Sequence, residues 1–87
     1  MLINIKYMGL PAVRANKTEE SIEFNGVNLA DLLDVLFEKY GKAFSDALLL
    51  PSGKLKIAVL VNSQASEFET VLEDGDLVVF FQPSYGG

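Results

Sequence analysis

The residues whose types could carry chemistry lie at the end of the printed sequence, where residues 82–87 have the sequence QPSYGG. An extended tail of that length reaches about 20 Å, and paired glycines are narrow enough to enter a partner's channel. An α-carboxylate, with a pKa of about 3.5, is ionised at neutral pH and is a poor electrophile. The carboxylate of Gly87 would therefore need activation, for which adenylation by ATP is the usual route. The alternative is a frayed end without a role.

Composition restricts the chemistry available elsewhere in the chain. The 87 residues include no Cys and no His, which excludes disulfides, Cys/His zinc sites, thiol catalysis and the usual haem ligands. Met1 and Met8 are inert thioethers, so a sulfur atom attached at Gly87 would be the only reactive sulfur in the chain. We expect no side-chain catalytic machinery, no bound cofactor and no metal.

The clustered acidic residues are expected to be solvated rather than catalytic. Residues 74–76, with the sequence DGD, could belong to a cation loop, but no further ligands follow at calcium-loop spacing, so a hairpin turn is favoured. Asp31, Asp34 and Glu38 share the outer face of a predicted helix. A convex helix surface offers no pocket for an acid–base pair.

The charge balance bears on partners and location. Seven Lys and Arg against twelve Asp and Glu give a formal net charge of −5, which argues against nucleic-acid binding and favours a basic partner groove. Lys54 and Lys56, on one side of a predicted strand, either protect a sheet edge or meet an acidic partner. No apolar run approaches the roughly 20 residues of a membrane helix, and no signal peptide is recognisable. We therefore expect no membrane contact and a cytoplasmic location.

Hydrophobic periodicity predicts a sheet and one helix. Apolar residues recur at helical spacing over residues 29–40, with Asn28 as N-cap, Asp31 in the first turn and Gly41 as a left-handed C-cap. Period-two patterns predict strands, and residues 77–81 are apolar on both faces, as in a central strand. The predicted strands, with a short edge segment at 68–72, span residues 2–8, 21–24, 55–61 and 77–81.

Two connections are predicted to be irregular. Residues 9–17 contain Gly and Pro and lose periodicity. Residues 42–53 are expected to tuck Phe44, Leu48 and Leu50 inward before a Pro-Ser-Gly turn.

The element order is two strands, a helix, and two or three further strands. A right-handed crossover places the last strand beside the first, in parallel. This order predicts an α+β fold, a ubiquitin-like β-grasp with a mixed four- to five-stranded sheet and one main helix packed across it. The domain is expected to span residues 1–81, followed by a flexible C-terminal tail, residues 82–87, that ends in Gly-Gly.

The final strand is also the candidate partner surface. If Val78 and Phe80 pack under the helix, Val79 and Phe81 expose an apolar strip that leads to the tail, with Phe81 as the predicted anchor. The alternative is that loops of the same chain cover both faces of the strand.

Several motifs together resemble the MoaD/ThiS family of ubiquitin-like sulfur carriers, and most resemble the small subunit of molybdopterin synthase. They are Val61-Asn62 after an apolar strand, the sequence LEDGDLVVFFQP at residues 72–83, and the Gly-Gly end. The literal resemblance covers residues 57–87, and the earlier residues agree in element order. Gln82 stands where that branch often has another Pro, and Tyr85 stands where a small residue is common.

The resemblance implies a non-catalytic carrier subunit. A ubiquitin-activating-like enzyme would adenylate Gly87 with ATP, and a cysteine desulfurase or rhodanese-type sulfurtransferase would supply sulfur for a thiocarboxylate. The tail residues Pro83, Ser84, Tyr85 and Gly86 would carry that group into the large subunit of molybdopterin synthase, which forms a heterotetramer with the carrier. There the sulfur would form the dithiolene of molybdopterin.

The same Gly-Gly end is also compatible with other functions. The sulfur acceptor could belong to thiamine, sulfur amino-acid or tungsten-cofactor synthesis. The same carboxylate could join the chain to lysines as a protein modifier. A non-covalent β-grasp interaction module is the remaining alternative, and removal of the two glycines would leave only that function intact.

Overall fold

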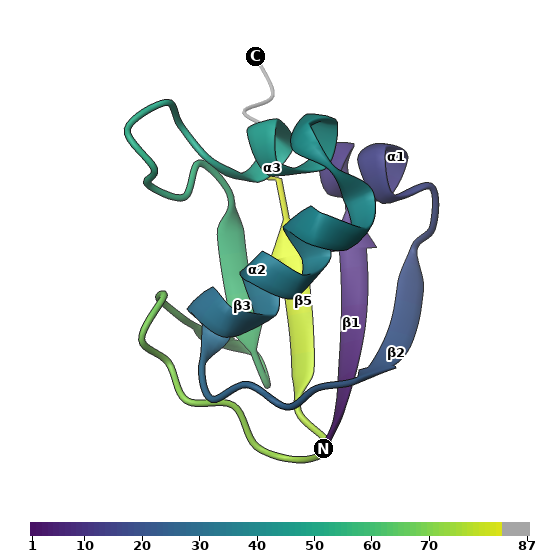
Figure 1. The fold of residues 1–87 in the computed structure, drawn as a ribbon, viewed down its shortest axis with the longest axis vertical. Helices are drawn as coiled ribbons and strands as arrows, with labels where there is room; N and C mark the ends of the chain where they lie inside the picture. Colours follow the sequence, from purple (N-terminus) through teal and green to yellow (C-terminus); the bar gives the residue numbers. More distant parts are fainter. Residues whose placement is uncertain (83–87) are drawn as a thin grey trace.

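A computed structural model of the chain describes residues 1–82, which form a five-stranded mixed sheet with three helices packed against it (Figure 1). The strands are β1 Leu2–Met8, β2 Glu19–Glu23, β3 Ala58–Val61, β4 Gln64–Ala65 and β5 Leu77–Phe81. The helices are α1 Leu10–Ala15, α2 Leu29–Tyr40 and α3 Lys42–Leu48. The sheet order is β2-β1-β5-β3-β4, with β1 and β5 parallel and the other pairs antiparallel. The predicted β-grasp topology, with the last strand central and parallel to the first, is confirmed.

Alternation along the two parallel strands buries one face of the sheet. Ile3, Ile5 and Tyr7 of β1 are at most 2% exposed, and Val78 and Phe80 of β5 are fully buried. α2 crosses this face (Figure 1), and full burial of each large apolar side chain contributes roughly 1.5–3 kcal/mol. The α2 residues buried in the same core are Leu29, Leu32, Leu33 and Leu36.

Local hydrogen bonds determine where α2 begins. Oδ1 of Asn28 accepts a hydrogen bond from the Asp31 N–H at 3.0 Å, and Oδ2 of Asp31 accepts one from the Asn28 N–H at 3.4 Å. The two bonds form a capping box, which confirms the predicted N-cap. The predicted left-handed cap at Gly41 is wrong, because φ is +86° but ψ is −170°. This conformation, open to glycine, turns the chain directly into α3.

Two short helices occupy segments that were expected to be irregular. Pro11 lies in the first turn of α1, where a missing N–H costs no helical hydrogen bond. α3 buries Phe44, Ala47 and Leu48, which lie at helical spacing. Helices of six and seven residues are too short to be stable alone, so packing of α1 against α3 and the core stabilises them. Leu50, expected to point inward, is 43% exposed because it lies beyond the end of α3.

The sheet edge and the last turn also differ from expectation. The edge strand is β4, whereas residues 68–72 lie beside the start of α2 and reach it through the bridge between Asn28 and Val71. Residues 73–76 contain the predicted turn but no hairpin, because β5 pairs with β1 and β3. The Gly75 N–H instead donates to the first carbonyl of β1 at 2.8 Å, which fastens the turn to that strand.

No helix within residues 1–82 combines the length and the apolar character that crossing a membrane requires.

Candidate functional site

The sheet face opposite α2 carries an apolar strip over its three central strands. Strand register places Phe81 of β5 between Met8 of β1 and Ala58 of β3, and places Val79 beside Leu60. Met8 is 47% exposed and the other four are half-buried. These residues, Met8, Ala58, Leu60, Val79 and Phe81, are the outer strip.

The structure decides which face of β5 is buried, and it meets the condition on which the exposed strip was expected. Val78 and Phe80 point into the core, whereas Val79 and Phe81 lie on the opposite face, as alternation along a strand requires. A contiguous apolar strip at the end of the strand that leads out of the domain suits a protein partner. The roles of Val79 and Phe81 in partner binding stay predictions.

The chain leaves the sheet through Gln82. Residues 83–87, which include Gly87 and the rest of the predicted tail, lie outside the described residues, so the roles expected of them stay predictions. Among residues 1–82, Gln82 itself makes two hydrogen bonds. Its Oε1 accepts from the Leu10 N–H at 3.0 Å, and its own N–H donates to the Met8 carbonyl at 3.4 Å.

Gln82 supplies a cap that α1 lacks locally. The N-cap residue Gly9 has no side chain that could accept a hydrogen bond from the first turn of α1. The Leu10 N–H therefore depends on Gln82 for its acceptor. Gly9 has φ of +78°, and an added Cβ would lie 3.1 Å from the Gln82 Cβ. Both the backbone conformation and the close approach therefore favour glycine at this position.

Replacing Gln82 with alanine is expected to lower the free energy of unfolding by about 1 kcal/mol, because a helix N-terminal donor loses its acceptor. Amide hydrogen exchange should accelerate most at Leu10, and denaturant unfolding gives the stability change. Gln64→Ala is the matched control, since that glutamine is exposed on β4. Unchanged exchange at Leu10 in the Gln82 variant would show that this contact does not hold α1.

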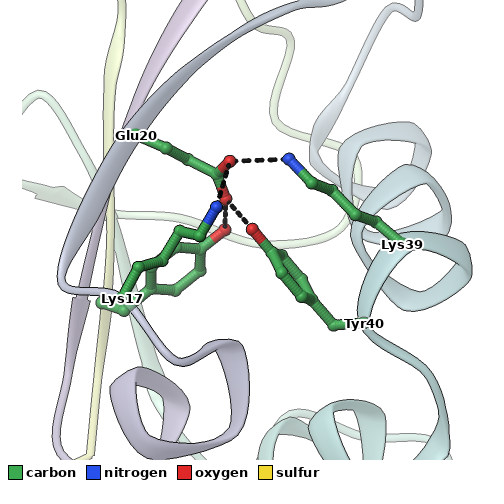
Figure 2. Close-up of polar contacts among 5 residues, drawn as sticks. Lys17, Glu20, Lys39 and Tyr40 are labelled. Atoms are coloured by element: carbon green, nitrogen blue, oxygen red, sulfur yellow. Dashed lines mark hydrogen bonds and ion pairs between the residues drawn. The ribbon is translucent and has the colours of Figure 1, made fainter.

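A polar cluster joins β1, β2 and α2 (Figure 2). The Glu20 carboxylate accepts hydrogen bonds from the Tyr7 hydroxyl at 2.6 Å, from the Tyr40 hydroxyl, and from Lys39 Nζ at 2.8 Å. Lys17 Nζ lies 3.5 Å from the same carboxylate. The Glu20 side chain is only 10% exposed. These residues are the Glu20 cluster.

The Glu20 cluster is a structural link and not an acid–base site. Burial acts to raise the pKa of Glu20, but hydrogen bonds from Lys39, Tyr40 and Tyr7, with the charge of Lys39, outweigh it and lower this pKa to about 2. Burial raises the pKa of Tyr7, and its hydrogen bond to Glu20 raises it further. Neither group has the pKa near neutrality that acid–base catalysis uses.

Sequence reasoning missed this cluster because Glu20 precedes the strand predicted at residues 21–24. The available signal was alternation, since Glu20 and Ile22 share the inward face of β2, opposite Ile5 and Ile3. A carboxylate at an inward position requires hydrogen-bond donors. The search for those donors leads to tyrosines on β1 and α2.

Comparison with known proteins identifies the family. The family model described as the ThiS family matches residues 5–87. The solved structure of Urm1 from Trypanosoma brucei is 31% identical, with a TM-score of 0.75, over 99% of this chain and 95% of that chain. SAMP1 from Haloferax volcanii is 24% identical, with a TM-score of 0.86, over 100% of both chains. The comparison with curated proteins gave no match.

Two further neighbours are structures of complexes. A chain in the complex of subunits 1 and 2 of the molybdopterin-converting factor from Helicobacter pylori is 23% identical, with a TM-score of 0.68, over 100% of both chains. The BexX/CysO complex from Amycolatopsis orientalis also contains a similar chain, with a TM-score of 0.75. At these identities the likeness shows the shared fold. Because the family model covers nearly the whole sequence, the chain belongs to the ThiS family, which comprises sulfur carriers and ubiquitin-like modifiers.

Proposed function

We propose that the chain is a cytoplasmic sulfur carrier that acts through the carboxylate of Gly87 as the small subunit of a molybdopterin synthase. The observation that carries the carrier function is the family match, which extends through residue 87 and so includes the Gly-Gly end. The choice of molybdopterin synthase is supported by the molybdopterin-converting factor among the structural neighbours. The outer strip supports the proposal, because Val79 and Phe81 lie on the strand that leads to that end. In this proposal the described residues provide binding surfaces, and the reacting atoms belong to the terminal carboxylate.

Activation consumes one ATP. A carboxylate oxygen of Gly87 attacks the α-phosphorus of ATP on a ubiquitin-activating-like adenylating enzyme, and pyrophosphate leaves. The terminal sulfur of a persulfide on a sulfurtransferase or cysteine desulfurase then attacks the acyl carbon of the adenylate, and AMP leaves. A second thiol cleaves the resulting acyl disulfide, which gives the thiocarboxylate and a disulfide. Glycine has no side chain to hinder these attacks.

Sulfur transfer requires the large subunit of the synthase. That subunit binds the outer strip, and the thiocarboxylate enters its active site and donates sulfur to the forming dithiolene. Water then restores the carboxylate, so the carrier can be activated again. Two carriers and two large subunits form the proposed heterotetramer.

A protein modifier is the second candidate, and the comparisons favour it specifically. SAMP1, a small archaeal modifier protein, has the highest TM-score among the neighbours reported above. The modifier shares the adenylation step with the carrier. The two functions therefore differ in the product, which is an isopeptide bond to a lysine for the modifier and a thiocarboxylate for the carrier.

The intact mass of the chain tests the proposal. After incubation with ATP, the adenylating enzyme and a sulfur donor, replacement of one carboxyl oxygen by sulfur should appear at Gly87. A variant that lacks Gly87 is the control and should keep its original mass. Addition of the large subunit and the molybdopterin precursor should then consume the thiocarboxylate and yield dithiolene.

Each function gives a different outcome in this experiment. Lysine-linked conjugates without dithiolene would support the modifier. A thiocarboxylate that the large subunit does not consume would favour a sulfur carrier for thiamine or sulfur amino-acid synthesis over the molybdopterin function. If neither an adenylate nor a thiocarboxylate forms, the carrier and the modifier are both excluded, and the non-covalent interaction module remains.

A further inference from the structure

Cationic side chains gather at one end of the fold. Residues 57–82 contain five Asp and Glu but no Lys or Arg. α1, α3 and the segment that precedes β3 lie at the end of the sheet where β5 finishes (Figure 1). These elements carry Arg14, Lys42 and Lys56, whereas the acidic turn at residues 73–76 is fastened to the start of β1, at the other end.

Two adjoining hollows open among these cations. One lies between α3 and the segment before β3 and is lined by Lys42 and Lys56. The other lies between α1 and α3 and is lined by Arg14 and again by Lys56. Asp46 borders both hollows and pairs with Lys42 at 2.7 Å. Within residues 1–82, Arg14 and Lys56 form no ion pair, so Lys42 is the one cation of the three that Asp46 neutralises.

We propose that this basic end, defined by Arg14, Lys42 and Lys56, docks on an acidic surface of the adenylating enzyme that receives the C-terminal tail. This inference rests on the proposed function. It adds that the adenylating enzyme, the first enzyme to act on the carrier, offers an acidic docking surface. The location of the basic end supports the proposal. Leu10 lines the second hollow, and its N–H donates a hydrogen bond to Gln82, the residue from which the tail leaves. A surface docked here therefore adjoins the base of the tail.

Salt screening lets a chain of net charge −5 approach an acidic surface through its basic end. The Debye length is about 8 Å at physiological salt, whereas the longest extent of the molecule is 39 Å. The acidic turn at the far end is therefore screened while the basic end makes contact. Charge complementarity would then orient each encounter with the tail foremost.

The test removes the two unpaired cations. The double variant Arg14→Ala with Lys56→Ala makes the net charge more negative by two, and both side chains are exposed. Asn25→Asp with Ser63→Asp changes the net charge equally and serves as the control. Both control residues are exposed and lie where β2 and β3 end, near the start of β1 and of β5. Aspartate also tolerates the φ of +71° at Ser63.

ATP–pyrophosphate exchange by the purified adenylating enzyme is measured against carrier concentration at low and high salt. At low salt the double variant should raise KM about tenfold with kcat nearly unchanged, because oriented encounter is lost and chemistry is not. High salt should raise the KM of the parent and have little effect on that of the double variant. The control pair should keep the parent's KM.

The outcomes separate the two proposals. Exchange by the parent chain with an unchanged KM in the double variant would overturn the docking surface and leave the carrier function standing. No exchange with any chain would contradict the proposed function and the docking surface with it. NMR shifts of the hollow residues with inorganic phosphate alone, together with an unchanged KM, would assign the hollows to a small anion instead.

Discussion

The Glu20→Ala variant is expected to lose about 3 kcal/mol of unfolding free energy at pH 7, because a carboxylate whose side chain is only 10% exposed no longer accepts the hydrogen bonds that converge on it. Two tyrosine hydroxyls and Lys39 would lose their common acceptor, and the link between β2 and α2 would be broken. For a domain of this size the loss corresponds to a fall in Tm of about 12 to 24 °C. Thermal and denaturant unfolding measure both quantities.

The matched control is Glu19→Ala, which removes the same charge from the preceding, exposed residue. Its expected effect is within about 0.5 kcal/mol, as for surface substitutions generally. Equal effects at the two positions would mean that net charge, and not the Glu20 cluster, sets the stability.

Acid should remove the contribution of Glu20. Its pKa is lowered to about 2 in the folded chain from the ordinary value of 4.5, so the folded state favours the ionised form. The stabilisation is therefore present above the unfolded pKa and is lost as the pH falls toward the folded pKa. In unfolding experiments from pH 6 down to about pH 2, the difference between the parent and Glu20→Gln should shrink steadily. A constant difference would show that Glu20 keeps an ordinary pKa when folded.

The second large effect concerns the outer strip. Phe81→Ala is expected to weaken binding of the synthase large subunit about thirtyfold, since a central aromatic anchor contributes about 2 kcal/mol to a protein interface. Titration of the large subunit by calorimetry gives the Kd, and the rate of dithiolene formation should fall in parallel at low carrier concentration. Adenylation should be much less affected, because that step is proposed to use the basic end.

Two further variants make the Phe81 result interpretable. Val79→Thr keeps the side-chain volume and adds a hydroxyl to the strip, so it should weaken binding with little loss of stability. Val35→Ala truncates a valine that is 42% exposed on α2, opposite the strip, and should leave the Kd unchanged. If Phe81→Ala lowers stability but not affinity for the large subunit, the outer strip stabilises the fold and the large subunit binds elsewhere.

Regular periodicity made the main elements predictable from the sequence. Within residues 2–8, apolar and polar side chains alternate, so the pattern itself indicates which side chains face the core, whereas residues 77–81 are apolar on both faces and identify a central strand without choosing its inward face. α2 was equally predictable, because consecutive members of its apolar stripe, and the two residues of its capping box, are at most three apart in the sequence. The order of these elements, with right-handed crossover, was enough to place β5 beside β1.

The candidate site also has features that the sequence shows and features that only the folded structure shows. The Gly-Gly end and the absence of Cys and His are properties of the sequence itself, so the carboxylate chemistry could be inferred without a fold. Alternation placed Val79 and Phe81 on one face of their strand and Val78 and Phe80 on the other, and the structure showed that Val78 and Phe80 are the buried pair. Their neighbours Met8, Ala58 and Leu60 became part of one strip only through strand pairing.

Contacts between distant residues were left to the tertiary structure. Gln82 caps α1 across 72 positions of sequence, and Glu20 gathers donors from β1 and α2. α1 and α3 are too short to be stable alone and become helical by packing on each other and on the core. The sequence by itself thus determined the locally periodic elements, which depend on neighbours along the chain, and it suggested the terminal chemistry that we propose. Only the tertiary structure decided the short helices, the Glu20 cluster and the basic end, because each depends on burial and proximity that folding alone creates.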